Sequence, residues 1–356
     1  MDGVFHVRLV RAVNAHADAG LIAPCLLPFA SLFVSESHDR LKEYLPGFRV
    51  EPPNAIEIVR SSRHRTKLLL SKSHDLSELV DTYAEIATKE REYFSSLHTG
   101  FLAPLKRLVQ PDLGFCTVDG QIFSTTHGTR FIYGMDSRNP ERMRELGYTV
   151  AAYCTQLVAA FAPTLELPPF PSRSLGEVRQ TDIKSKALYR RGTLGALPEK
   201  WAAVLTMVLA NLNVVRHILS PLVGEECQST TKLRVLQCFN AIHSIRRVQD
   251  QLRGEGRLPS DAAELLGRAV SSPEAKWLRR RDDLRDMLVH FAPRTVEPKY
   301  SGLSFAEAVA VFGRASSEEV LARTNELLRH LTSVLEDGFG LDKNAFWYGR
   351  LPEHED

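Results

Sequence analysis

The sequence has little net charge and no closely spaced pair of cysteines. Its 356 residues include 45 Lys and Arg against 43 Asp and Glu, which gives a formal net charge of +2. So small an excess does not indicate a general nucleic-acid binder, and any such binding has to come from local basic patches. The cysteines are odd in number and none has C-x2-C spacing: Cys25, Cys116, Cys154, Cys227 and Cys238. We therefore expect buried thiols in a reducing cytoplasm, with no zinc site, disulfide framework or other cofactor.

A long apolar run is also missing. The run Leu21–Val34 has fourteen residues and contains Pro24 and Pro28, whereas about 18 apolar residues are needed to cross a bilayer as a helix. It follows Asp18, which is far from the N-terminus for a signal peptide. We therefore expect no membrane partner. With 44% hydrophobic and 25% charged residues, the chain has an ordinary globular composition and is long enough for two domains.

Residues 1–162 have a mixed pattern that predicts an α+β domain. A hairpin is predicted over Phe115–Phe123, because Asp119-Gly120 at its centre suits a backbone with positive φ. Apolar periodicity predicts helices over Leu76–His98 and Pro140–Phe161. Shorter apolar runs predict strands at Val4–Val10, Ile56–Val59, Thr66–Leu70 and Arg130–Tyr133. The region contains no phosphate loop, metal-ligand cluster or nucleophile elbow motif, so its role stays open.

Residues 163–198 are rich in proline and basic side chains and have little periodicity. This composition indicates a linker, or an extended arm laid over the surface. A second interpretation is a basic strap for nucleic acid, in which Tyr189 stacks on a base. Proline and mixed charge explain the segment without a ligand, so the plain linker is the simpler prediction.

Residues 199–340 show helical periodicity almost throughout. The predicted helices are Glu199–Ser220, Thr230–Gly254, Ser260–Val270, Pro273–Phe291 and Ser317–Leu335. The last of them begins with a capping signature, Ser316-Ser317-Glu318-Glu319, and follows a loop over Ala292–Leu303. Short connections favour antiparallel neighbours. We therefore predict an all-α, up-and-down helical bundle, followed by a tail at residues 341–356.

The predicted helix Pro273–Phe291 carries three side chains suited to phosphodiester chemistry. Arg285, Asp286 and His290 lie away from its apolar stripe, and Asp286 and His290 are four positions apart, so their side chains can form a hydrogen bond. Val289 falls between the polar residues on the helical wheel. An exposed apolar residue at this position suggests contact with a second copy of the same helix.

The spacing alone is weak, because arginine followed by histidine five to seven positions later recurs at Arg11/His16, Arg91/His98 and Arg323/His330. Roughly three such pairs are expected by chance in a chain of this composition. The Arg285 copy differs in having an apolar stripe behind it and a polar residue directly after the arginine. Only the Arg91 copy, followed by Glu92, shares the second property. A solvated charged face remains the alternative interpretation.

The segment from Trp201 to Gly340 resembles a HEPN-superfamily domain. Such domains are small up-and-down bundles with an R-x4-6-H motif, in which Asn, Asp or His usually follows the arginine. Arg285, Asp286 and His290 fill these three places. Many HEPN proteins are metal-independent endoribonucleases whose site forms across a homodimer, whereas others have lost catalysis and act as binding or scaffold modules. Asp286 stands where Asn is commoner, and adds negative charge near a phosphate.

The resemblance implies a transesterification in which the ribose 2′-hydroxyl attacks its own phosphate and leaves a 2′,3′-cyclic phosphate. In this reaction His290 acts as general base or acid, Asp286 orients the His290 imidazole ring, and Arg285 holds the phosphate. The basic side chains expected to bind RNA are Arg246, Arg247, Arg279, Arg280 and Arg281.

The resemblance implies two partners: RNA, and a second copy of the chain in a homodimer or higher homo-oligomer. The biological setting implied is a toxin or an anti-phage defence effector. Two alternatives stay open. The first is a non-catalytic HEPN-like module that acts through dimerisation, and the second is a helical scaffold unrelated to HEPN.

Overall fold

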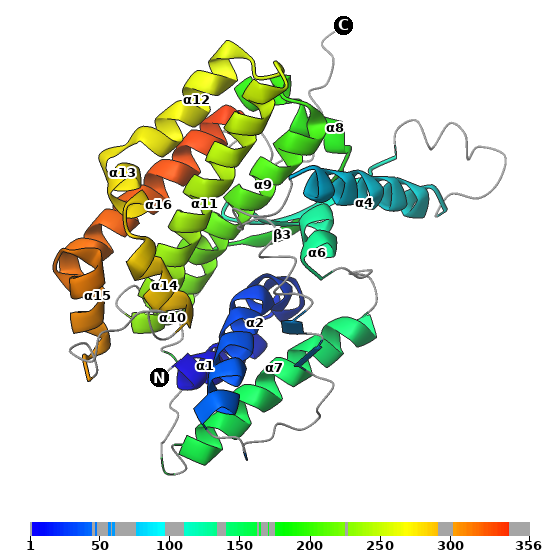
Figure 1. The fold of residues 1–356 in the computed structure, drawn as a ribbon. Coiled ribbons are helices and arrows are strands. Elements are labelled where there is room, and N and C mark those ends of the chain that lie inside the picture. Colours follow the sequence, from blue (N-terminus) through cyan, green and yellow to red (C-terminus); the bar gives the residue numbers. More distant parts are fainter. Residues whose placement is uncertain are drawn as a thin grey trace, which may run out of the picture.

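The computed structural model describes residues 2–44, 47, 56–57, 59–60, 76–96, 110–133, 140–161, 164, 170, 175–224, 227–290 and 302–341. The predicted strand Thr66–Leu70 and most of the predicted loop Ala292–Leu303 and of the tail 341–356 lie outside these residues. Figure 1 shows helices α1, α2 and α7 at one end of the molecule, the C-terminal bundle at the other, and a small sheet with α4 and α6 between them.

Three N-terminal helices pack on one another: α1 (Asp2–Asn14), α2 (Ala19–Tyr44) and α7 (Pro140–Phe161). The prediction of α7 is confirmed, but the predicted strand Val4–Val10 is wrong. Phe5, Leu9 and Val13 are buried at four-residue spacing, which places them on one side of α1. The predicted strand Ile56–Val59 is wrong as well, because its described residues are helical.

Helix α2 contains two prolines and stays continuous. Because Pro28 has no backbone N–H, the carbonyl of Pro24 loses its usual partner within the helix. The Tyr133 hydroxyl donates a hydrogen bond to that carbonyl. Two helical stretches of the described chain are long and apolar enough to cross a membrane, Ala19–Glu43 and Glu199–Val223, and their most apolar windows are 56% and 83% buried inside the protein.

The sheet has three antiparallel strands in the order β2-β1-β3. Strands β1 (Leu113–Val118) and β2 (Gln121–Thr125) form the predicted hairpin, and Asp119 and Gly120 have φ of 43° and 103° at its turn. Helix α4 (Leu76–Ser96) is also confirmed. The predicted strand Arg130–Tyr133 is wrong, because these residues end helix α6 (Thr126–Tyr133).

The third strand comes from the predicted linker. Strand β3 (Val178–Ile183) pairs with β1, and helix α8 (Ser185–Tyr189) and the 3-10 turn η1 (Thr193–Ala196) follow it. The linker interpretation of residues 163–198 is therefore wrong for this part of the segment. Tyr189 is 1% exposed, so it is not available to stack on a base, as the alternative interpretation of a nucleic-acid strap required.

The predicted helical bundle is present. It comprises α9 (Glu199–Asn213), η2 (Val214–Leu219), α10 (Ser220–Val223), α11 (Gln228–Gly254), α12 (Ser260–Ser271), α13 (Pro273–Arg279), α14 (Asp282–His290), α15 (Phe305–Gly313) and α16 (Ser317–Gly338). The sequence did not predict α15. It also predicted one helix over Pro273–Phe291, whereas the chain breaks between α13 and α14. Ser316 caps α16 as expected, since its side chain accepts the Glu319 N–H.

The first bundle helix runs past its predicted end at Ser220. Pro221 cannot donate a backbone hydrogen bond, and the chain before it widens into the π-helical segment η2. The Ser220 N–H and hydroxyl both donate to the Val215 carbonyl, the hydroxyl at 2.8 Å. The helix therefore accommodates the proline and continues to Val223.

The N-terminal helices and the bundle share one core. The main cluster of buried apolar side chains runs from Phe5 to Phe339. A part-buried ion pair also joins the two parts, with Lys232 Nζ of α11 2.8 Å from Asp2 Oδ2 of α1, while the Ser229 hydroxyl donates to Asp2 Oδ1 at 2.6 Å. Burial raises the pKa of Asp2, but the Lys232 ammonium and the hydrogen bonds from Lys232 and Ser229 outweigh it and leave this pKa below its ordinary value.

Candidate functional site

Helix α14 holds the predicted motif with its apolar side inward. Leu284 and Leu288 are buried, as the helical wheel predicted. The side chains of Arg285 and Asp286 are 33% and 34% exposed, and Arg285 Nη1 donates to Asp286 Oδ1 at 2.5 Å. His290 is the last residue of α14. Its side chain lies outside the described part of the chain, so the hydrogen bond between Asp286 and His290 stays a prediction.

Val289 is buried, and the expectation that it is exposed is wrong. It is 9% exposed and lines a small cavity with Phe29, Leu32 and Phe33 of α2. Helix α14 packs against α2 of the same chain. An intramolecular contact therefore explains an apolar residue beside Arg285 and Asp286, and Val289 no longer argues for a homodimer.

A cluster of arginines lies one helical turn before Arg285. Partial burial lowers the pKa of Arg281, and so do three neighbouring positive charges, on Arg314, Arg280 and Arg323. The guanidinium carbons of Arg281 and Arg323 lie 6.0 and 5.3 Å from the centre of the Trp277 ring. We call Trp277, Arg280, Arg281, Arg314 and Arg323 the arginine patch. As RNA-binding residues the sequence singled out only Arg280 and Arg281 of it, because Arg314 and Arg323 come from the end of α15 and from α16.

The remaining predicted RNA-binding residues are half-buried, which suits contact with RNA less well than full exposure. Arg279 is half-buried at the end of α13. Arg246 and Arg247 are half-buried on α11, away from α14 in the sequence. Acidic residues also begin α14, since Asp282 and Asp283 are exposed in its first turn. The structure therefore brings Arg281 and Arg285 into adjacent turns, with carboxylates beside them.

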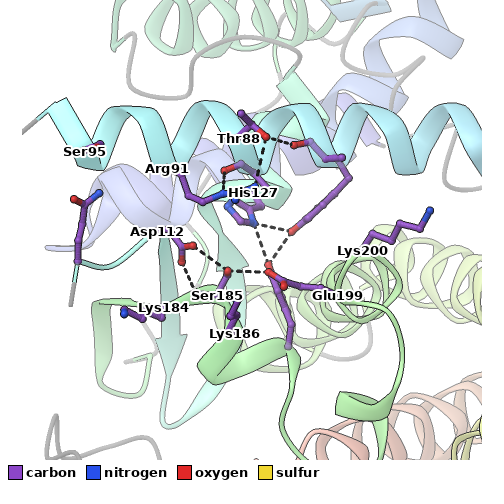
Figure 2. A pocket seen from close by; sticks show the side chains of 15 residues that line it. Thr88, Arg91, Ser95, Asp112, His127, Lys184, Ser185, Lys186, Glu199 and Lys200 are labelled. Atoms are coloured by element: carbon purple, nitrogen blue, oxygen red, sulfur yellow. Dashed lines mark hydrogen bonds between the residues drawn. The ribbon is translucent and has the colours of Figure 1, made fainter. Parts of the chain in front are cut away.

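A second candidate site is a pocket with a volume of about 510 Å³, which we call the α4–α9 pocket (Figure 2). Its lining comes from α4, from residues 110 and 112 before β1, from α6, from Lys184 and α8, and from the start of α9. The sheet brings two of these segments together, because the pairing of β1 with β3 places Asp112 and Ser185 at the same end, and α4 packs against α6 and α9.

Two carboxylates meet at one serine in this pocket. Asp112 accepts hydrogen bonds from the Ser185 backbone N–H at 2.5 Å and from the Ser185 hydroxyl at 3.2 Å. The same hydroxyl lies 3.0 Å from Glu199 Oε1 (Figure 2). A hydroxyl has one proton, so it serves one of the two carboxylates fully at a time.

The inner wall of the pocket is a buried group of two tyrosines and a histidine. The hydroxyls of Tyr83 and Tyr189 are 2.7 Å apart, and they lie 3.0 and 3.3 Å from His127 Nδ1. Burial lowers the pKa of His127 to about 4, although the nearby carboxylate and backbone of Asp112 oppose this. Burial also raises the pKa values of Tyr189 and Tyr83 well above the ordinary value for a tyrosine. All three groups are therefore neutral at pH 7.

Positive side chains line the solvent side of the pocket: Arg91, Lys184, Lys186 and Lys200. The sequence did not predict this pocket. Its local signals were Arg91, in the rival arginine–histidine pair whose His98 lies outside the described residues, and the basic segment 163–198, which contains Lys184, Lys186 and Tyr189. Among the described residues, no three His, Cys, Asp or Glu side chains are grouped so as to hold a metal ion.

No family model, curated protein or solved structure matches this chain. The resemblance to HEPN domains therefore depends on the motif residues of α14 and on the bundle that carries them. The functional argument starts from the two sites themselves.

Proposed function

We propose that the bundle is a HEPN-like module that binds RNA and cleaves it without a metal, with Arg285 and His290 as its catalytic residues. The observation that carries this proposal is the position of Arg285. Its side chain is part-exposed on α14, one turn after Arg281 and the arginine patch, while Leu284 and Leu288 supply the packing. The side chains of Arg285 and Asp286 are thus available for a ligand.

The chemistry fits these positions. Arg285 gives one of its five N–H groups to Asp286, which leaves a guanidinium able to bind phosphate oxygens. His290 lies on the same helix, four positions after Asp286. An imidazole can both take a proton from the 2′-hydroxyl and return one to the leaving 5′-oxygen. The arginine patch would bind the flanking phosphates, with Trp277 beside it.

A non-catalytic module is the second candidate function. It is favoured by the 2.5 Å ion pair between Arg285 and Asp286, which gives both side chains a structural partner. In this function the exposed face of α14 binds a partner surface and no bond is cleaved.

The deciding experiment is to incubate the protein with single-stranded RNA in EDTA and to analyse the ends of the products. We expect fragments with 2′,3′-cyclic phosphate ends from the parent protein. The Arg329→Ala variant serves as control, because this exposed arginine of α16 pairs with Glu326 and belongs to neither site. Intact RNA with every preparation would favour the non-catalytic module.

A further inference from the structure

The α4–α9 pocket has the dimensions of a small-molecule site. Its volume of about 510 Å³ lies within the roughly 300–1,000 Å³ typical of such sites. Its wall is formed by four helices and the segment before β1, and Ser185, His127 and Tyr189 are buried in it. The pocket is therefore part of the folded core and not a groove along one helix.

Its solvent side favours an anion. Arg91, Lys184 and Lys186 are exposed and Lys200 is half-buried, and they approach the pocket from different elements. The Arg91 guanidinium donates to the Ala87 carbonyl at 3.1 Å and to the Thr88 hydroxyl at 3.5 Å, and neither oxygen neutralises its charge. Arg91 also lies near enough to His127 to lower its pKa. A compact anion such as a phosphate group fits these donors.

The carboxylates favour hydroxyl groups on the same ligand. Ser185 has one hydroxyl proton for Asp112 and Glu199, at 3.2 and 3.0 Å. One of the two carboxylates therefore has an acceptor oxygen in the pocket that this proton does not serve. Free hydroxyl groups donate to such oxygens without bringing a charge. The neutral wall of Tyr83, Tyr189 and His127 leaves the cations and carboxylates as the pocket's charged groups.

We propose that the α4–α9 pocket binds a small phosphorylated sugar, with its phosphate on Arg91, Lys184, Lys186 and Lys200 and its hydroxyl groups on Asp112 and Glu199. A free sugar phosphate and a mononucleotide share this chemistry. The site is independent of the RNA chemistry proposed for α14, because it uses none of the same residues.

Isothermal titration of the full chain with ribose 5-phosphate and with AMP tests the proposal, with ribose, adenosine and inorganic phosphate as comparison ligands. We expect at least one phosphorylated sugar to bind more tightly than ribose, adenosine or phosphate. Equal affinity for ribose 5-phosphate and AMP would identify a sugar-phosphate site, and tighter AMP binding a nucleotide site. Either result supports the proposal.

Two variants locate the binding. Arg91→Ala and Lys186→Ala should each weaken it about tenfold, the usual effect of losing one charge-assisted contact. Lys89→Ala on the same α4 helix is the matched control, because Lys89 is exposed, pairs with Glu85 at 3.9 Å and does not line the pocket. Thermal melts check that each variant folds. The proposal is overturned if neither phosphorylated sugar binds, or if the folded pocket variants bind as tightly as the Lys89 control.

Discussion

The exposed face of α14 and the α4–α9 pocket present charge in two different ways. On α14, Arg285 and Asp286 belong to one helix, are about one-third exposed and pair with each other. In the pocket, Asp112, Ser185 and Glu199 come from three segments and surround a space of about 510 Å³. The first arrangement suits a long polyanion that lies across a surface, and the second suits a small ligand that enters.

The largest expected effect separates the two sites by activity. If α14 is catalytic, Arg285→Ala and His290→Ala should each reduce RNA cleavage by at least about a hundredfold, because each removes a charge or a proton carrier from the transition state. Arg91→Ala in the pocket should leave cleavage unchanged. The measurement is the rate of formation of 2′,3′-cyclic phosphate ends, with circular dichroism melts as the control for folding. Equal loss in all three variants would contradict the separation.

The next effect tests whether the N-terminal helices and the bundle are one cooperative unit. Removing Lys232 leaves the part-buried Asp2 carboxylate without its cation. Breaking a fully buried pair typically costs about 3–5 kcal/mol, so we expect a smaller cost for this one. We expect Lys232→Ala to lower the melting temperature and to keep a single transition, because both parts share the main core. Differential scanning calorimetry is the measurement, and the exposed Lys89→Ala variant is the control. Two separated transitions in the parent protein would mean that the parts unfold independently.

A third prediction concerns acid stability, which the pocket and the N-terminal helices share. Burial lowers the pKa of His127 to about 4 and that of His6 to about 4. Both values lie below the ordinary 6.5, so the unfolded chain binds these protons first and stability falls as pH drops from about 6.5 towards 4. Each histidine contributes up to about 3 kcal/mol to this loss.

Urea unfolding at several pH values measures this loss. His127→Gln should flatten the dependence in this window, whereas substitution of the half-buried His330 on α16 should not. A free energy of unfolding that stays constant between pH 7 and pH 5 would contradict the assignment of two neutral buried histidines.

The two sites also differ in how far the sequence could predict them. The bundle helices and the inward position of Leu284 and Leu288 were predictable, because apolar periodicity within one helix fixes its buried side. The burial of Val289 was not predictable, since it depends on contact with α2, which lies more than two hundred residues earlier in the chain. The same limit explains the missed pocket, because only the pairing of β1 with β3 brings Asp112 and Ser185 together.

The wrong predictions of local structure have related causes. Strand β3 is mostly polar and none of its residues is fully buried, and its pairing with β1 holds it in the sheet, so apolar alternation could not reveal it. In helix α1 the local sequence pattern is present but favours the wrong structure. Its Val and Phe residues favour a strand locally, but packing on α2 and α7 makes it helical.

The smallest expected effect, that of Asp286→Asn, separates catalysis from scaffolding on α14 itself. In the catalytic function an amide oxygen can still accept a hydrogen bond from His290, so cleavage should survive. The acidic limb of its pH profile should move to lower pH, because the negative charge that favours the protonated imidazole is gone. RNA binding should tighten slightly, since the carboxylate no longer repels phosphate and no longer pairs with Arg285.

In the scaffold function the same substitution breaks the ion pair, and it should weaken only the association with a partner or a second copy. The required measurements are cleavage rate against pH and the dissociation constant from sedimentation, for the parent protein and for Asp286→Asn. Asp283→Asn is the matched control, because Asp283 is an exposed carboxylate of the same helix. An unchanged pH profile with a loosened assembly would refute the catalytic role of α14, whereas a moved limb with unchanged assembly would refute the scaffold.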